Sequence, residues 1–326
     1  TLSIQIQSRD QDRLSLYLFD ATTGKGRLVL TEVEPGWVNL HDHLYFFKDG
    51  RHVLWSSERT GFRHLYLYDI EGRLVRQLTH GEWQVETLCG VDEARGVVYF
   101  TATEKSPLER HLYRVALDGT GLTRLSTEEG WHVITFSPTF EYYLDIYSNI
   151  TTPPRLSLHR ADGARVAYIE ENVVEELREY ALGPVEFLTV RAEDGTPLPA
   201  MMIKPKGFDP RRRYPVIVYV YGGPRAQVVV NRWGGDRFLW HQLMAQRGFL
   251  IFSLDNRGSW GRGKAWELKI HRRLGYWEVK DQLAGVAYLK SLPYVDPERI
   301  GIWGWSYGGY MTSLIVTKTK RFKAAS

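Results

Sequence analysis

The sequence has few of the features that commit a protein to a special environment. A single cysteine, Cys89, stands among 326 residues, so the chain can form neither an internal disulfide nor a metal site built on several thiolates. No apolar run approaches the roughly 18 residues that a membrane-spanning helix needs, and no signal peptide opens the chain. The net charge is only +4, from 42 basic and 38 acidic residues dispersed along the chain. These absences give no basis for a nucleic-acid partner or a membrane segment, and they leave the cellular compartment open.

Four similar segments divide the first half of the chain. Each begins with leucine, continues with apolar residues and ends in an acidic turn, and they recur about every 45 residues, a period typical of β-propeller blades. Alternating apolar residues at 52–57 and 96–101 predict a further strand before two of them. We therefore expect residues 1–182 to form a partial β-propeller of about four blades, ending in a polar, helical connector near 170–177. The four segments are Leu16–Asp20, Leu65–Asp69, Leu112–Asp118 and Leu156–Asp162.

Residues 183–326 have a different rhythm. Runs of nearly unbroken apolar residues alternate with stretches that favour helices, which predicts a mostly parallel sheet covered by helices on both faces. At 326 residues the chain is long enough for this second core beside the first. The expected strands cover 185–190, 198–204, 216–221 and 249–254, and the expected helix covers 278–292.

The stretch from Gly304 to Gly308 has the form G-x-S-x-G around Ser306. Apolar residues 299–304 predict a strand before it, and residues 310–316 predict a helix after it. The two glycines let the backbone turn sharply enough to expose the serine hydroxyl at the end of a strand, which is the nucleophile elbow of α/β-hydrolases. We therefore expect a partial β-propeller followed by a C-terminally truncated α/β-hydrolase domain, with Ser306 as the catalytic nucleophile.

An acyl-transfer serine also needs donors for the oxyanion of its intermediate. The backbone N–H of Tyr307, the residue after the nucleophile, is one expected donor. The loop after the strand at 216–221 is expected to supply the other. Gly222, Gly223 and Pro224 turn the chain sharply there, so the Tyr221 hydroxyl should lie near the carboxyl edge of the sheet.

The base that would activate Ser306 is not evident. In this fold the acid and the histidine follow the serine along the chain, yet no Asp, Glu or His follows Ser306. His241 and His271 are the two histidines of the second half, and both lie in helical, polar stretches where a surface or interface role is expected.

Four motifs occur together in the order and spacing of a known family. They resemble the dipeptidyl peptidase IV branch of the prolyl oligopeptidase family of serine peptidases, over essentially the whole chain and most strongly after residue 185. The motifs are Tyr221-Gly222-Gly223-Pro224, Leu254-Asp255-Asn256-Arg257-Gly258-Ser259, Arg272-Arg273-Leu274-Gly275 and Gly304-Trp305-Ser306-Tyr307-Gly308-Gly309-Tyr310.

This resemblance implies a peptidase that releases dipeptides or tripeptides after a proline or alanine near the N-terminus of a peptide, through an acyl-enzyme at Ser306. It also implies that the catalytic Asp and His and the proline-binding aromatic residues lie beyond Ser326, and that the full-length parent dimerises. The family's paired glutamates, which hold the substrate amine, are not found here. Glu128-Glu129, Glu170-Glu171 and Glu175-Glu176 lack the flanking aromatic pattern. We therefore expect the chain as it stands to be inactive.

Other interpretations stay open at this point. The same scaffold serves acyl-peptide hydrolases and esterases, and a propeller fused to a hydrolase without its triad serves as a non-catalytic binding protein; the presence of Ser306 favours an enzyme. His41 and His43 flank Asp42 on one strand face, but no third metal ligand is evident. Residues 258–263 lack the lysine and hydroxyl spacing of a phosphate-binding loop. We expect neither a metal nor a cofactor.

Overall fold

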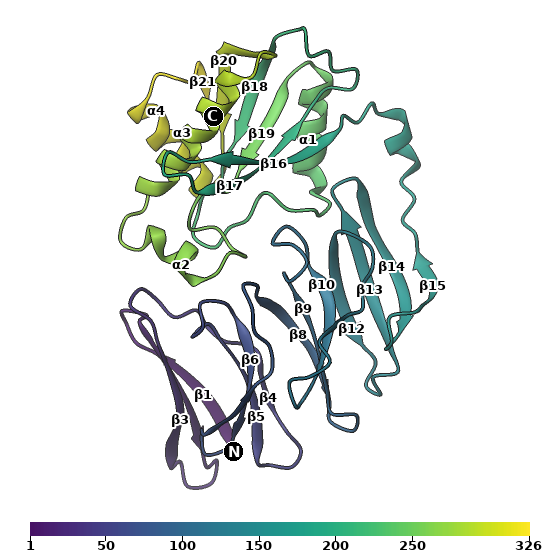
Figure 1. Cartoon of the computed structure of the whole chain (residues 1–326), viewed down its shortest axis with the longest axis vertical. Coiled ribbons are helices and arrows are strands. Elements are labelled where there is room, and N and C mark those ends of the chain that lie inside the picture. Colours follow the sequence, from purple (N-terminus) through teal and green to yellow (C-terminus); the bar gives the residue numbers. More distant parts are fainter.

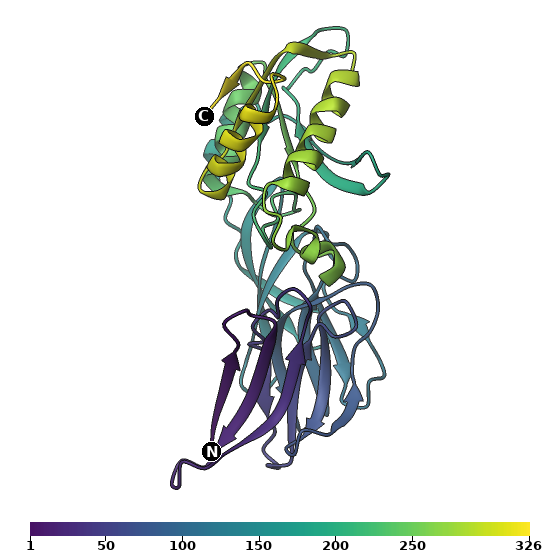
Figure 2. The same cartoon turned by 90° about the vertical axis from the view of Figure 1, so that its left-hand side faces the viewer.

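The computed structural model describes residues 1–326 as two bodies that lie end to end (Figures 1 and 2). Residues 2–170 form four small antiparallel sheets, and residues 185–325 form one larger sheet with helices. The N-terminus lies in the body of small sheets and the C-terminus in the helical body (Figure 1). The change of rhythm in the sequence thus corresponds to a change of architecture.

Each small sheet is a meander of strands that pair in chain order. The first sheet has three strands and the other three have four. The strands of the first two sheets are β1 (Leu2–Gln7), β2 (Arg13–Phe19), β3 (Gly26–Val33), β4 (Leu44–Phe46), β5 (His52–Ser57), β6 (His64–Asp69) and β7 (Leu74–Gln77). Those of the last two are β8 (Val85–Asp92), β9 (Val97–Ala102), β10 (His111–Ala116), β11 (Thr123–Arg124), β12 (Trp131–Phe136), β13 (Tyr142–Asn149), β14 (Thr152–Arg160) and β15 (Arg165–Glu170).

The predicted repeat is confirmed as one blade per period. The four leucine segments are the next-to-last strands β2, β6, β10 and β14 of their sheets, and the expected strands before them are β5 and β9. The acidic residue that ends each segment forms the following turn, because its carboxylate accepts a backbone N–H two to four residues later at 2.8 or 2.9 Å. The four turn residues are Asp20, Asp69, Asp118 and Asp162.

Hydrophobic side chains fill the spaces between neighbouring sheets. Leu16 of the first sheet packs with Trp55 of the second in one buried cluster, and Leu65 of the second packs with Phe100 of the third in another. Leu112 and Tyr143 join the third sheet to the fourth. Each sheet thus buries apolar residues against its neighbour, which is how propeller blades are held together.

The segment after β15 was expected to be a helical connector. It contains a single 3-10 turn, η1 (Glu175–Glu179), in which no residue is buried. Because no apolar face holds this segment to either body, the helix does not extend beyond that turn.

The larger sheet has the order β16-β17-β19-β18-β20-β21. Its four strands β18 to β21 are parallel, as expected, whereas β16 and β17 form an antiparallel edge. The strands are β16 (Val185–Arg191), β17 (Pro197–Ile203), β18 (Tyr214–Tyr219), β19 (Leu250–Leu254), β20 (Val295–Trp303) and β21 (Ala324–Ala325). The helices are α1 (Gly235–Gln246), α2 (Lys264–Glu267), η2 (Leu268–Ile270), α3 (Tyr276–Ser291) and α4 (Tyr307–Lys318).

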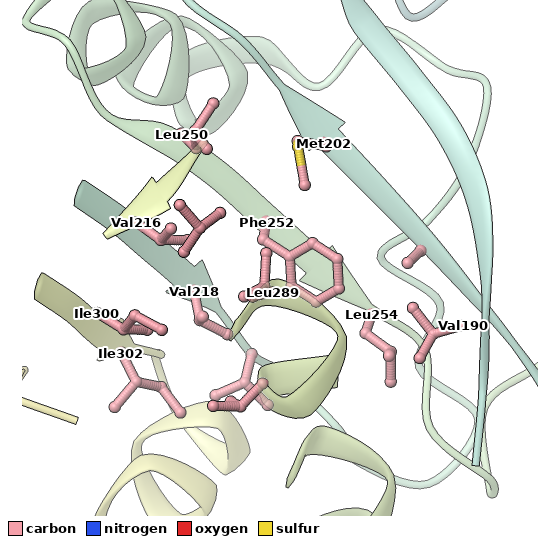
Figure 3. Close-up of a cluster of buried hydrophobic side chains, with 14 of the residues drawn as sticks. Val190, Met202, Val216, Val218, Leu250, Phe252, Leu254, Leu289, Ile300 and Ile302 are labelled. Carbon is pink, nitrogen blue, oxygen red and sulfur yellow. The ribbon is translucent and has the colours of Figure 1, made fainter. Parts of the chain in front are cut away.

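Successive residues of the central strands point to opposite faces of the sheet, and each face is covered by different helices. Val216 and Val218 belong to the larger core, with Leu289 of α3 and Met311 of α4, part of which is drawn in Figure 3. Ile217 lies between them in sequence and packs on the other side, in the cluster that contains Phe238 of α1. The period of two in a strand therefore places α1 on one face and α3 and α4 on the other.

The two bodies meet at α2, which points toward the small sheets in Figure 1. Lys264 of α2 is buried between the carboxylates of Glu58, at 3.3 Å, and Glu267, at 3.7 Å. The Asn39 amide donates to both carboxylates at 2.8 and 3.1 Å. The backbone joins the same contact, because the N–H of Lys264 donates to the Gly61 carbonyl at 2.7 Å.

Candidate active site

Ser306 lies in the tight turn between β20, which ends at Trp303, and α4, which begins at Tyr307. Its φ of 58° and ψ of −119° fall in a region that residues other than glycine rarely adopt. The side chain is exposed, and its hydroxyl makes no hydrogen bond to another side chain of this protein. The strand, the sharp turn and the helix that the sequence predicts are all confirmed.

Close packing explains why glycine occupies positions 304 and 308, on either side of Ser306. A Cβ on Gly304 would lie 2.4 Å from the carbonyl oxygen of Val220, and one on Gly308 would lie 2.2 Å from the same oxygen. The Gly308 N–H also donates to the Trp305 carbonyl at 2.9 Å and closes the turn. Only glycine allows the elbow to approach the end of β18 this closely.

Tyr221 lies just past the end of β18, at the same edge of the sheet as the elbow. Strands β18 and β20 are parallel and pair Tyr219 with Trp303, so two further residues bring Tyr221 beside the turn that holds Ser306. The ring of Tyr221 lies 6.3 Å from that of Tyr307, centroid to centroid. The residue therefore lies at the expected edge of the sheet, and its role as an oxyanion donor stays a prediction.

The loop after Tyr221 is shaped by its two glycines. Gly222 has a φ of +75°, and its carbonyl accepts a hydrogen bond from the Asn256 amide at 3.1 Å. A Cβ on Gly223 would lie 2.7 Å from the Tyr221 ring, so this position must lack a side chain if the ring is to stay where it is.

Tyr307 contributes both its backbone and its side chain. Its N–H is the first of α4, where no acceptor exists within the helix, and it donates no hydrogen bond in the structure. Its hydroxyl donates to Glu278 of α3 at 2.9 Å. Burial, the charge of Glu278 and this hydrogen bond together raise the pKa of Tyr307. The sequence indicated the N–H but gave no signal for the contact between the two helices.

Arg257 fixes the neighbouring loop through contacts that the sequence did not reveal. Its guanidinium donates to Asp281 of α3 at 2.6 Å and to Asp194 at 2.5 Å, and it lies 4.0 Å from the centre of the Trp277 ring. Its own N–H donates to Asp281 at 2.8 Å. This buried charge is thus paired on two sides, as a buried arginine requires.

The two histidines of the hydrolase body do not serve as a base for Ser306 in this structure. His241 was expected to have a surface or interface role, but it is buried on α1 against Tyr219 and Trp303, whose ring centroids lie 5.3 and 5.8 Å from that of His241, so a surface role is wrong. His271 stacks on Trp37 of the propeller body at 5.7 Å, which confirms an interface role. Neither histidine hydrogen-bonds to Ser306.

The histidine pair at 41 and 43 and the paired glutamates have ordinary structural surroundings. His41 and His43 are buried, burial lowers their pKa values to about 3 and about 4, and no group of three potential metal ligands is present. Glu128 pairs with Arg165 at 3.4 Å, and the remaining paired glutamates are exposed. None of the helices has the length and apolar character to cross a membrane.

The fold and the elbow define a class of protein, a β-propeller joined to an α/β-hydrolase domain. Two family models match the chain: the dipeptidyl peptidase IV N-terminal region over residues 1–154 and the prolyl oligopeptidase family over residues 237–326. The chain belongs to the dipeptidyl peptidase IV branch of the prolyl oligopeptidase family. The expected architecture of a partial propeller and the start of a hydrolase domain is thereby confirmed.

Individual relatives agree with this assignment. The chain is 32% identical to the dipeptidyl-aminopeptidase B of Aspergillus niger, over 95% of this chain and 36% of the relative, and 30% identical to mouse dipeptidyl peptidase 8, over 99% and 41%. It superposes on the crystal structure of Porphyromonas gingivalis dipeptidyl peptidase 4 with a TM-score of 0.92 and 35% identity, over 99% of this chain and 46% of that one. The chain thus spans less than half the length of these relatives.

Proposed function

We propose that the protein is a serine dipeptidyl peptidase in which Ser306 is the nucleophile. The observation that carries this proposal is the backbone of Ser306, held at φ 58° between β20 and α4, with an exposed side chain and with Tyr221 6.3 Å, ring to ring, from the next residue, Tyr307. Strain of this kind persists only where the surrounding structure imposes it, and it concentrates at functional sites. The relatives named dipeptidyl peptidases support the type of reaction.

In the proposed mechanism, the Ser306 oxygen attacks the carbonyl of the scissile peptide bond. The free N–H of Tyr307 and the hydroxyl of Tyr221 donate hydrogen bonds to the oxyanion that forms. Collapse of this intermediate expels the amine, which receives the proton that the base took from Ser306, and leaves an acyl-enzyme that water then hydrolyses.

The base that takes the Ser306 proton is proposed to be a histidine, oriented by an aspartate, in a part of the protein after residue 326. Without a base, a comparable triad loses about 10⁶ in turnover. We therefore propose that the 326-residue chain alone is inactive. The boundary between the propeller with its connector and the hydrolase domain is proposed at residues 182 and 183.

The proposed substrates are peptides with proline or alanine near a free N-terminus, and the complete protein is proposed to form a dimer. The propeller is proposed to admit these peptides and to exclude larger folded proteins. These statements follow from the family resemblance of the Ser306 and Tyr221 motifs, and each is open to direct measurement.

The test uses the product of the complete reading frame that contains this chain. It should release the chromophore from alanyl-prolyl-p-nitroanilide, but not from the N-acetylated form of that substrate. Ser306→Ala should abolish turnover, and Tyr221→Phe should lower kcat by about 10² to 10³. Tyr310→Phe, an exposed tyrosine of α4, is the matched control and should keep full activity.

Other outcomes would replace the proposal with a different function. Hydrolysis of simple esters or of N-acetylated peptides, without cleavage of the free dipeptide substrate, would indicate an esterase or acyl-peptide hydrolase. No turnover of any of these substrates would leave a non-catalytic binding protein.

A further inference from the structure

A pocket of about 170 Å³ lies on the α1 face of the large sheet, apart from the Ser306 elbow. Its floor is made by Tyr219, Ser253 and Met201, which are direct partners on the neighbouring strands β18, β19 and β17. Residues 227, 228, 230 and 232–234, the start of α1 and Ile150 of the propeller body form its walls. Neither Ser306, Tyr221 nor Tyr307 lines it. The carboxyl ends of β18 and β19 are the region where open α/β sheets place ligands.

Two buried polar atoms in this pocket lack partners within the protein. Ser253 is 1% exposed and His241 is 3% exposed, yet neither the Ser253 Oγ nor the His241 Nε2 makes a hydrogen bond. Buried polar atoms in folded proteins are nearly always paired, because an unpaired one is unfavourable. Both residues line the pocket, so a ligand with polar atoms can satisfy them there.

The pocket has a positive charge that nothing in its lining offsets. Arg232 and Arg237 line it, no Asp or Glu does, and neither arginine forms an ion pair. Arg237 instead donates to the Tyr219 hydroxyl. Desolvation and the charge of Arg237 lower the pKa of Arg232, although both arginines are exposed, and burial with the same charge lowers the pKa of His241 to about 4. His241 is therefore neutral at pH 7 and retains one ring N–H to donate.

Helix α1 adds to the positive charge of the pocket. Arg237 and His241 are four residues apart and lie on one face of the helix. The first turn of this 12-residue helix points its free N–H groups toward the same end, at Gly234, which lines the pocket, whereas the exposed Asp236 of that turn does not line it. The positive end of the helix dipole favours an anion there.

We propose that this pocket binds a carboxylate that carries an apolar group. The arginines and the helix end select the negative charge, and the unpaired Ser253 and His241 provide hydrogen bonds. Apolar side chains, among them Met201, Phe238 and Trp233, provide the remaining surface. A free monocarboxylic acid and the C-terminal residue of a peptide share this chemistry. The inference does not depend on catalysis by Ser306.

The experiment titrates phenylacetate by calorimetry into the product of the complete reading frame that contains this chain, with phenylacetamide as the neutral control of the same shape. We expect saturable binding of phenylacetate and binding of phenylacetamide that is weaker by about tenfold or more. Arg237→Gln and Arg232→Gln should each weaken the binding of phenylacetate by about tenfold. Arg247→Gln, at the exposed far end of the same helix, should leave the affinity unchanged.

A second arm separates the two sources of the carboxylate. N-acetyl-glycyl-phenylalanine and its C-terminal amide have no free amine, so their binding is independent of aminopeptidase action. Displacement of phenylacetate by the acid but not by the amide would assign the pocket to peptide C-termini. Failure of both to displace it would assign the pocket to free acids.

Three results would overturn the inference. They are equal binding of acid and amide, unchanged affinity in both arginine variants, and no saturable binding below about 20 mM phenylacetate. Arg237→Gln removes the contact to Tyr219 and can disturb the fold. Arg232 makes no hydrogen bond within the chain, and its cation–π contact is to the Trp131 ring, 4.7 Å from the ring centre, so its variant disturbs the fold less and keeps the test decisive.

Discussion

At the scale of single residues, the elbow combines backbone strain with very close packing. Ser306 holds an unfavourable φ, and Gly304 and Gly308 both lie against the carbonyl of Val220. The strain is thus sustained by packing from β18, a strand more than eighty positions earlier in the chain. A side chain at either glycine should act on the fold before it acts on chemistry.

Gly308→Ala should lower the free energy of unfolding by about 3 kcal/mol, because its Cβ would overlap a backbone oxygen that cannot move independently. Gly309→Ala is the matched control, since its Cβ would meet only the Gly304 oxygen, at 3.4 Å. Urea unfolding of the two variants makes the comparison. Equal stability of both would show that the elbow is looser than its geometry indicates.

Asp255 should make the stability of the protein depend on pH. Burial raises its pKa to about 7, although its carboxylate accepts the N–H groups of Val228 and Val229. Its unfolded pKa is about 3.9, so between these values the folded protein holds a proton that the unfolded chain has released. Stability from this group is therefore highest near pH 4 and falls by up to about 1.4 kcal/mol per unit as pH rises toward 7.

Asp255→Asn should remove this slope, because an amide does not titrate. Urea unfolding at pH 5 and pH 7 should show a smaller difference for the variant than for the natural protein. An equal difference in both would mean that Asp255 is ionised throughout and that its pKa is not raised.

Residue identity at the elbow could be predicted because the motif is local. Ser306, its two glycines and the N–H of Tyr307 lie within five positions, and the turn geometry requires small residues there. The partners of Asp255 and Glu278 could not be predicted in this way. Each depends on loops or helices that meet only in the folded sheet, as when Glu278 receives the Tyr307 hydroxyl.

At the scale of elements, one hydrogen bond joins α3 to α4. The Glu278 side chain accepts the Tyr307 hydroxyl at 2.9 Å through one oxygen and the Gly275 N–H at 3.0 Å through the other. It therefore caps the start of α3 and holds the first turn of α4 at the same time. The position of the proposed oxyanion donor depends on this carboxylate.

Tyr307→Phe should destabilise the protein by about 2 kcal/mol, because it leaves one oxygen of a buried carboxylate without a partner. Tyr310→Phe, on the exposed side of the same helix, should change the free energy of unfolding by less than about 0.5 kcal/mol. Thermal or urea unfolding of both variants checks this. A loss of stability in Tyr310→Phe as large as that in Tyr307→Phe would contradict the account.

The bounds of the long helices and strands were well predicted, whereas the directions in which the strands pair were predicted less well. The helix expected at 278–292 is α3 at 276–291, and the four expected strands lie within three residues of β16 to β19 at either end. The antiparallel edge of β16 and β17 was not foreseen, because buried strands show the same apolar runs in either direction. The short strands β4 and β11 gave no periodic signal at all.

At the scale of the whole molecule, a buried charge cluster fastens the propeller body to the hydrolase body. Lys264 is 4% exposed between Glu58 and Glu267, and Asn39 donates to both carboxylates. Burial raises the pKa of Glu267. Asn39 and Glu267 are separated by 228 positions, which is why the sequence could not reveal the cluster.

Lys264→Met should destabilise the protein by about 3 kcal/mol, because it leaves the buried Glu58 carboxylate without a cation and the buried Glu267 carboxylate with Arg225 alone, at 3.5 Å. The loss of stability should grow as pH rises above about 4.3, the pKa of Glu in the unfolded chain. Above that pH the unfolded chain releases the proton, whereas the folded variant favours the protonated form of Glu267. Lys269→Met, at an exposed position next to α2, is the control. Urea unfolding at pH 5 and pH 8 measures both variants, and a loss independent of pH would contradict the role of the carboxylates.

The central claim is that Ser306 is an activated nucleophile. The most direct measurement is reaction of the product of the complete reading frame with a fluorophosphonate, followed by mass spectrometry of the peptides. One adduct is expected, on the peptide that contains Ser306, and none in Ser306→Ala. An intact, folded protein in which Ser306 stays unmodified, or in which another residue carries the adduct, would contradict it.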